Sequence, residues 1–242
     1  MTETPPPRRI APESGPHLWT AEALSPADWM LPFGAETLAA GRLEPVLSRV
    51  AERLTHGQGF VLLRGLPAPA EPQALLTQLA APLGRPVSLP DGEGPFLTQP
   101  CDMLLLLCIA PATVTLRSAA AVHNALMKAD RTLLEVFYRP LPLAGTEWEL
   151  PVFAVDRGVF SARLDRLAIA GATPAPALQA LDAALEQPGL ALSLPLRPGD
   201  LLAVNPLLVW ATRAPGLLAQ PVLAREGSRL QDGAFAGLGG QG

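Results

Sequence analysis

The sequence predicts a mixed α+β protein, mainly β, folded as one domain. Many short apolar runs end at glycine or other turn residues, a pattern typical of sheet sandwiches and barrels. Segments with apolar residues at helical spacing precede and interrupt these runs, which places helices beside the sheets. Hydrophobic residues make up 49% of the 242 residues and charged residues 17%, so the chain can bury a large core. These observations favour a sheet sandwich with helices on one face.

The N-terminal third predicts an arm followed by two helices around a strand. Residues 1–16 contain the run PPPRR and predict a flexible arm. Apolar residues at helical spacing predict a helix from Leu43 to Leu54, and a second one from Glu71 to Leu83. The apolar run Phe60–Gly65 lies between them and predicts a buried strand.

The remaining two thirds predict mostly strands. Asp156, Arg157 and Gly158 form a turn signal between two apolar runs, which predicts a hairpin. Helices are expected at Ala119–Lys128 and Ala177–Leu185. The expected strands are Asp102–Cys108, Val114–Arg117, the hairpin strands Pro151–Val155 and Val159–Arg163, Leu190–Leu196, Leu201–Asn205, Leu207–Trp210 and Pro221–Arg225. The domain thus spans residues 17–225, followed by a Gly-rich, disordered tail over 226–242.

Charge and cysteine content exclude several classes of protein. A net charge of −4 and a pI near 5.4 argue against a nucleic-acid partner, because such binding needs clustered basic residues. Neither a signal-peptide core nor a run of membrane-spanning length is found. Cys101 and Cys108 point to opposite faces of one strand, so they cannot bridge within it and fit a reducing compartment. We therefore expect a cytoplasmic protein, and the Ala, Leu, Pro and Arg bias indicates a bacterial one.

Five segments, in their order, resemble the TauD/TfdA-like (clavaminate-synthase-like) Fe(II)/2-oxoglutarate-dependent dioxygenases. They are Gly59–Gly65, Cys101–Cys108, Ser118–Asn124, Pro151–Arg163, and Pro198–Asp200 followed by Asn205. The resemblance covers nearly the whole ordered chain, from about His17 to Arg225. It implies a double-stranded β-helix, or jelly roll, with flanking helices. It also implies an ancestral activity in which iron and 2-oxoglutarate activate oxygen.

The same resemblance shows that the iron ligands of the family are replaced. The family holds iron with two histidines and a carboxylate, the first two ligands in an H-x-D motif. Aligned on the motifs above, these ligand positions hold Leu97, Gln99 and Ala211. Leucine and alanine offer no donor atom, and a neutral amide alone cannot hold a divalent ion. Family halogenases replace only the carboxylate, so halogenation is not expected either. We expect Gln99 to hydrogen-bond across the former metal cavity, with Leu97 and Trp210 filling its volume.

The anion-binding arginine of the family has candidates in this chain. A late arginine in the family grips the distal carboxylate of 2-oxoglutarate through a planar guanidinium. The best match is Arg225, with Arg229 as the alternative, and Arg213 is a further candidate to pair with a carboxylate. No cofactor is expected, although an arginine pocket can hold 2-oxoglutarate without iron.

Other residues that could carry chemistry have structural interpretations. The three histidines are His17, His56 and His123, and a metal site would need two of them to converge. His123 matches a family helix position outside the metal site, and His56 ends a helix. Cys101 has no base nearby in sequence. Asp102 and Asp200 could be read as an acid–base pair, but a turn role suits Asp200 better.

These observations lead to a catalytically degenerate dioxygenase-fold protein. It would bind a small anionic ligand, or act as the partner of an active enzyme in a hetero-oligomer or homo-oligomer. The alternative is an iron-independent enzyme acting on an amino-acid-like or other small carboxylate in the retained pocket. A third interpretation is a structural interaction protein with a filled cavity.

Overall fold

The structure is a computed structural model that describes residues 10–39, 41, 43–88, 94–236 and 238. The helices are η1 (Ala21–Ala23), α1 (Pro26–Trp29), α2 (Ala35–Ala39), α3 (Leu43–Thr55), α4 (Pro72–Leu83), α5 (Ala119–Ala129), α6 (Arg131–Val136) and α7 (Ala175–Leu185). The strands are β1 (Met30–Pro32), β2 (Phe60–Arg64), β3 (Arg85–Pro86), β4 (Met103–Cys108), β5 (Ala112–Ser118), β6 (Leu141–Pro142), β7 (Glu149–Leu150), β8 (Phe153–Asp156), β9 (Val159–Ala162), β10 (Ala191–Leu196), β11 (Leu201–Val204), β12 (Val209–Ala211) and β13 (Leu217–Leu223).

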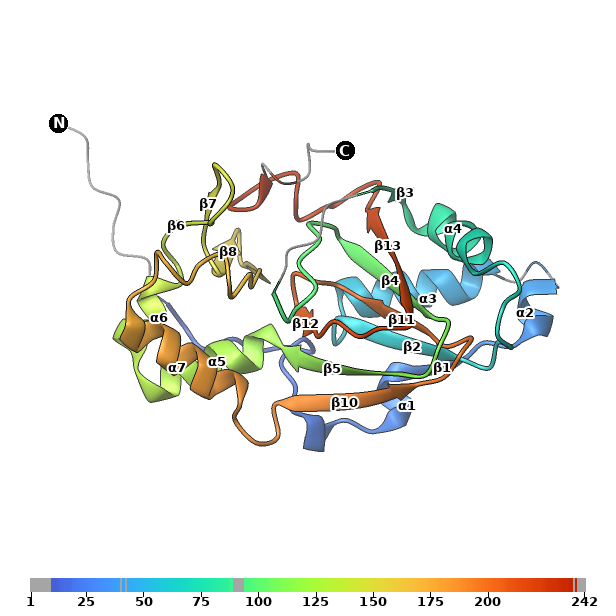
Figure 1. Cartoon of the computed structure of the whole chain (residues 1–242), viewed down its shortest axis with the longest axis horizontal. Helices are drawn as coiled ribbons and strands as arrows, with labels where there is room; N and C mark the ends of the chain where they lie inside the picture. The colour runs from blue at the N-terminus through green and yellow to red at the C-terminus, as the bar shows by residue number, and fades with distance from the viewer. Residues whose placement is uncertain (1–9, 40, 42, 89–93, 237, 239–242) are drawn as a thin grey trace.

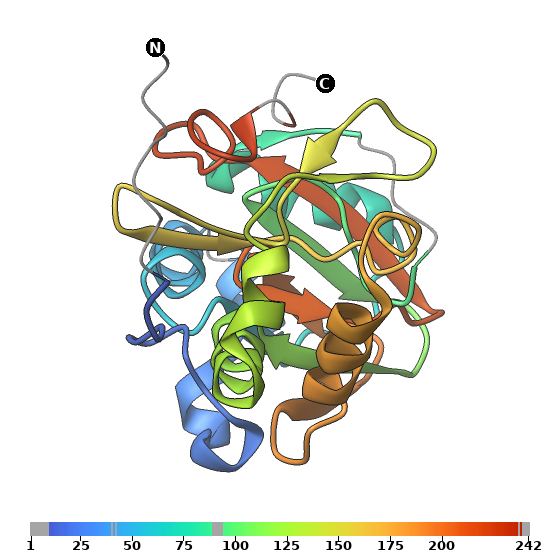
Figure 2. The same ribbon diagram turned by 90° about the vertical axis from the view of Figure 1, so that its left-hand side faces the viewer.

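Two sheets form the body of the molecule. The larger has six strands in the order β1-β2-β11-β4-β13-β3, and the smaller has the order β10-β5-β12. Apart from the parallel pair β1 and β2, neighbouring strands in both sheets are antiparallel. Helices α3 and α4 lie beside the larger sheet, whereas α5, α6 and α7 gather at one end of the molecule (Figure 1). Figure 2 views the molecule from that end, with α5 and α7 in front of the sheets.

Side-chain alternation along the strands divides the interior into two cores. In β4, Leu105 and Leu107 pack with α3 and α4, while Leu104 and Leu106 face the larger core shared with the smaller sheet. The other central strands alternate in the same way, because successive side chains of a strand point to opposite faces. Continuously apolar runs such as MLLLLC in β4 are therefore buried on both faces. This two-layer arrangement, with helices over one layer, agrees with the sandwich predicted from the residues.

Most of the elements expected from the sequence are confirmed within a few residues. The hairpin of β8 and β9 turns at Arg157 and Gly158, whose φ angles of 51° and 80° are those of a tight hairpin turn. Strand β12 begins two residues later than expected, and β13 begins four residues earlier. The helices η1, α1, α2 and α6 and the strands β1, β3, β6 and β7 were not expected. Strand β13 contains Pro221, which reads in the sequence as a strand start, although it lies inside the strand opposite Leu104.

Both chain ends pack against the domain where the structure describes them. Residues 10–16, predicted as part of a flexible arm, lie against α5 and α6, with Ile10 only 7% exposed. Arg131 donates to the Ile10 carbonyl at 2.9 Å. In the predicted tail, Leu230 and Phe235 are buried. Both segments place large apolar side chains in the core, which the Pro-rich and Gly-rich composition around them conceals. The rest of these two predicted segments, residues 1–9, 237 and 239–242, lies outside the described residues.

Candidate functional site

The two outer ligand-equivalent positions lie side by side in the structure. The Leu97 N–H donates to the Ala211 carbonyl at 2.9 Å, beside the β-bridge between Phe96 and Thr212. Opposed residues of an antiparallel pair project to the same face, so the side chains of Leu97 and Ala211 share one face. That face carries Leu116, the partner of Ala211 in β5, and belongs to the core between the two sheets.

Trp210 does not fill this space as expected. Trp210 precedes Ala211 in β12, so its side chain projects to the opposite face. There it is 1% exposed and packs against Phe153 and Phe96, with ring centroids 5.8 and 6.4 Å away. The residue that accompanies Ala211 on the inner face is Leu97, which is partly buried.

Gln99 differs from its two companions because it borders a cavity. Its side chain is 7% exposed, and its Oε1 has no hydrogen-bond partner among the described residues. The hydrogen bond that the sequence suggested across a former metal cavity therefore does not involve this oxygen. The cavity has a volume of about 440 Å³ and is also lined by Gln73, Ser88, Gln220 and four apolar residues.

The residues present do not fit the iron of the oxygenase fold. Leu97 and Ala211 have no donor atoms, which leaves the amide of Gln99 as the only polar side chain at the three positions. Within the described part of the chain, no group of three His, Cys, Asp or Glu side chains could hold a metal ion. The donor set of these positions is therefore inconsistent with the family's iron centre.

Two of the three candidate arginines, Arg213 and Arg225, donate to main-chain carbonyls of the surrounding structure. Arg213 follows the Leu97–Ala211 pair, and its Nε donates to the Gly94 carbonyl at 2.7 Å. Arg225 is exposed and donates to the Ala81 carbonyl at 3.0 Å, so it lies beside α4. Neither arginine presents a guanidinium to Leu97 and Ala211 in the contacts observed.

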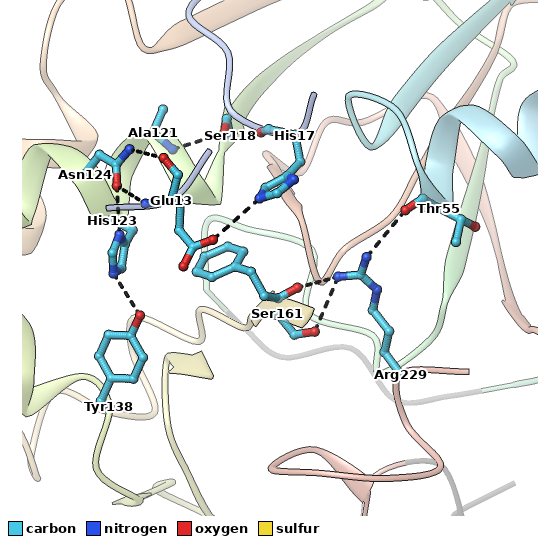
Figure 3. Close-up of polar contacts among 11 residues, drawn as sticks. Glu13, His17, Thr55, Ser118, Ala121, His123, Asn124, Tyr138, Ser161 and Arg229 are labelled. Carbon is cyan, nitrogen blue, oxygen red and sulfur yellow. Dashed lines mark hydrogen bonds and ion pairs between the residues drawn. The ribbon is translucent and has the colours of Figure 1, made fainter. Parts of the chain in front are cut away.

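Arg229 is the arginine that lies in a polar, enclosed setting (Figure 3). It donates from Nη1 to the Phe160 carbonyl and to Ser161 Oγ, the latter at 3.4 Å, and from Nη2 to the Thr55 carbonyl at 3.5 Å. These acceptors are neutral oxygens, and Arg229 forms no ion pair within the described residues. Burial lowers the pKa of its guanidinium, an effect that the nearby Asp102 carboxylate opposes.

A cavity of about 530 Å³ lies against this guanidinium. Its walls come from the end of α3, the hairpin of β8 and β9, and the segment after β13: Thr55, His56, Asp156, Arg157, Val159, Ser161, Gly227, Ser228, Arg229, Gln231, Asp232, Gly233 and Phe235. Arg157 and Asp232 form an exposed ion pair at its rim, with N and O 3.4 Å apart. A guanidinium has five N–H donors, and the three contacts of Arg229 leave two for a ligand.

The segment that carries Arg229 is fixed by Asp102. One carboxylate oxygen accepts from the Ala224 N–H at 2.8 Å. The other accepts from Ser228 Oγ at 3.0 Å and from the Arg229 N–H at 3.1 Å. Asp200 instead binds Arg64 through a two-pronged contact, with a shortest distance of 2.7 Å. The structure therefore assigns the two aspartates to separate structural roles and not to an acid–base pair.

His17 and His123 belong to one polar network that runs through Glu13 and Asn124 (Figure 3). Both imidazole rings also contact the ring of Phe160. His123 is fully buried, and its two ring nitrogens contact Asn124 Oδ1 at 3.0 Å and the Tyr138 hydroxyl at 2.8 Å. Burial lowers the pKa of His123, so its ring stays neutral. His17 stacks on Phe160 with centroids 5.8 Å apart. The third histidine, His56, lies in the wall of the Arg229 cavity, so the three do not form a metal site.

The sequence named Arg229 only as an alternative and gave no signal for its surroundings. Thr55, Ser161 and the C-terminal segment are brought to it by tertiary packing, and none carries a motif. Asp102 was the available clue, because a buried carboxylate ahead of an apolar strand needs partners from another part of the chain. The two cysteines are confirmed as buried and free.

Comparison with known proteins supports the fold and not the chemistry. No protein-family model matches the chain, and no curated protein matches it. Among solved structures, an asparagine oxygenase in complex with Fe(II), 3-hydroxyasparagine and succinate aligns with a TM-score of 0.58 and 22% identity, covering 76% of this chain and 79% of that one. The non-heme iron oxygenase OrfP in complex with Fe and α-ketoglutaric acid aligns with a TM-score of 0.54 and 16% identity, covering 82% of this chain and 94% of that one.

PvcB, an Fe, α-ketoglutarate-dependent oxygenase from an isonitrile synthetic pathway, is a third match. It aligns with a TM-score of 0.53 and 17% identity, covering 92% of this chain and 94% of its own. Identities at this level establish architecture alone. The matches extend over most of each chain and agree with the two-sheet topology described above. The chain therefore has the fold of the TauD/TfdA-like (clavaminate-synthase-like) Fe(II)/2-oxoglutarate-dependent oxygenases.

Proposed function

We propose that this protein is a pseudo-oxygenase that binds a small carboxylate without iron, in the cavity at Arg229. The single observation that carries the proposal is the setting of this guanidinium. It is largely shielded from water, borders a cavity of about 530 Å³, and contacts neutral oxygens where a carboxylate could complete its hydrogen bonding. The iron part of the function is excluded from the proposal because Leu97 and Ala211 cannot ligate a metal.

The chemistry of the cavity favours a carboxylate over a neutral ligand. A desolvated guanidinium gains more from an anion than an exposed one does, since the local dielectric is lower and its hydrogen bonds are charge-assisted. The carboxylates of Asp156 and Asp232 in the same walls would repel a polyanion, which favours a ligand of low charge. Small mono- and dicarboxylates meet both conditions. Asparagine oxygenase was solved with succinate and OrfP with α-ketoglutaric acid, so both acids are suitable probes.

Calorimetry in the presence of EDTA tests the proposal. The full-length protein is titrated with 2-oxoglutarate, succinate and an amino acid, and at least one is expected to bind without metal. Arg229→Gln should weaken this binding by about 2 kcal/mol, or roughly 30-fold, which is the value of a hydrogen-bonded charge. Arg225→Gln is the matched control, because this exposed arginine lies beside α4.

A second variant separates loss of binding from loss of the fold. Arg229→Lys keeps the positive charge but loses the planar fork, so we expect a smaller, roughly tenfold loss of affinity in a folded protein. Binding that requires Fe(II), or that survives Arg229→Gln unchanged, would overturn the proposal. Consumption of a bound acid in EDTA would replace it with the iron-independent enzyme. Absence of binding by every probe would direct the search to a protein partner.

A further inference from the structure

The cavity beside Gln99 is separate from the one at Arg229. It lies where β3 approaches the end of β13, and the two cavities share no lining residue. Its volume of about 440 Å³ suits a small molecule. This cavity is not part of the carboxylate site proposed above.

The walls of this cavity are polar but uncharged. Three amide side chains and one hydroxyl line it, together with four apolar residues: Gln73, Ser88, Gln99 and Gln220, with Pro86, Val87, Ala219 and Pro221. None of these side chains ionises. An ionic ligand would find no ion-pair partner among these side chains, so the lining favours a neutral molecule.

One amide of the cavity, that of Gln99, lacks a hydrogen-bond donor. Gln99 is 7% exposed and its Oε1 is buried without a partner. Gln220 donates from Nε2 to the carbonyls of Val87 and Pro221, both at 3.1 Å, so its amide oxygen is turned away from these acceptors. A buried acceptor without a partner is rare in a folded protein and calls for a specific explanation. A donor supplied by a ligand is one explanation that fits Gln99, and the oxygen of the neighbouring Gln220 offers a second acceptor.

We propose that this cavity binds a neutral primary carboxamide. Its two N–H groups would donate to the amide oxygens of Gln99 and Gln220, and its hydrocarbon part would lie against Ala219 and Pro221. The terminal torsion of glutamine is soft, so the Gln99 oxygen can turn toward the ligand at little cost. Gln99 occupies the position aligned with the family's carboxylate ligand, so replacing that carboxylate by an amide would have exchanged a metal site for a neutral one.

The test compares an amide with its charged isostere. The ¹⁵N-labelled protein is titrated with isobutyramide and, separately, with isobutyrate, and the side-chain amide signals of glutamine are followed by NMR. We expect isobutyramide to shift the Gln99 and Gln220 signals with millimolar affinity, and isobutyrate to bind there at least about tenfold more weakly. Gln99→Met, an unbranched replacement of similar length, should abolish the shifts at Gln220. Gln187→Met, at an exposed glutamine, is the control and should leave them intact.

Thermal unfolding of the same variants completes the test. Gln99→Met removes an unpartnered buried oxygen, so its melting temperature should equal or exceed that of the wild type. A lower melting temperature would show that the amide has a structural partner and would overturn the proposal, as would equal binding of isobutyrate. Arg229→Gln should leave isobutyramide binding unchanged, so failure of the carboxylate site and failure of this one are distinguishable.

Discussion

Leu97 lies opposite Ala211 of β12, and a main-chain hydrogen bond of 2.9 Å joins them beside the isolated bridge of Phe96 and Thr212. Their side chains share the inner face, and Gln99 follows two residues after Leu97 at the edge of a cavity. The main-chain pairing thus brings together the positions of the first and the last ligand of the family's iron centre, Leu97 and Ala211. The side chains at the three positions lack the two imidazoles and the carboxylate that an iron centre of this kind needs.

Restoring the ligands should restore a metal site. In the variant carrying Leu97→His, Gln99→Asp and Ala211→His together, two imidazoles and a carboxylate replace groups that cannot ligate. We expect this variant to take up about one equivalent of Co(II), seen by visible absorption of the ion, whereas the wild type takes up none.

The strand geometry provides a matched control for this experiment. Phe96 projects to the face opposite Leu97, where it contacts Trp210. A variant with Phe96→His in place of Leu97→His introduces the same two histidines and aspartate, but aims one imidazole away from the other ligands. Equal cobalt uptake by the two triple variants would contradict the assignment of these positions.

At the scale of elements, the helices and strands best predicted from the sequence are those in which burial dictates the spacing of apolar residues. Helix α3 and strand β4 appear at their expected places because the first has an apolar stripe and the second is buried on both faces. The start of β13 was missed because Pro221 suggests a boundary, and its pairing with β4 depends on strands remote in sequence. The Arg229 cavity was missed for the same reason, since its walls come from three separate elements.

Asp102 links one of these remote elements to the site. Its carboxylate, 7% exposed, accepts from Ala224, Ser228 and Arg229 and so holds the segment after β13 in place. Asp102→Ala should lower the free energy of unfolding by about 3 kcal/mol, because it leaves partly buried donors without an acceptor. Urea denaturation measures this loss, and carboxylate binding at Arg229 should weaken with it.

The ion pair between Asp182 and Arg166 serves as the control for the Asp102 substitution. Asp182 binds Arg166 through two contacts of 2.7 Å, but its side chain is 45% exposed. Asp182→Ala should therefore cost less than about 1 kcal/mol. If the two aspartate variants lose equal stability, the proposed role of Asp102 in fixing the C-terminal segment is wrong.

For the molecule as a whole, the order of weak motifs proved more informative than any one of them. Hydrophobic strands and turns are common to many folds, yet five in one order implied the jelly roll that the structure shows. The same comparison said nothing of the chain ends, which lie outside the matched motifs. None of the described helices is long and apolar enough to cross a membrane.

The N-terminal segment is part of the fold and should contribute to its stability. Ile10 is buried, and the side-chain amide of Asn124 accepts from the Glu13 N–H at 2.8 Å and donates to the Glu13 carbonyl at 2.9 Å. Ile10→Ala and Asn124→Ala should each lower the free energy of unfolding by about 1–2 kcal/mol.

The two losses should not add. Both substitutions release the same N-terminal segment, so the second contact contributes less to stability once the first is removed. The free energy of unfolding of the double variant should therefore fall by less than the sum of the two single losses. Urea denaturation of the three variants gives the coupling free energy directly. Ile109→Ala is the matched control, because this isoleucine is 43% exposed and its loss should change stability by less than about 0.5 kcal/mol. Losses at Ile10 and Asn124 no larger than this would mean that residues 10–16 behave as the free arm that their sequence predicts.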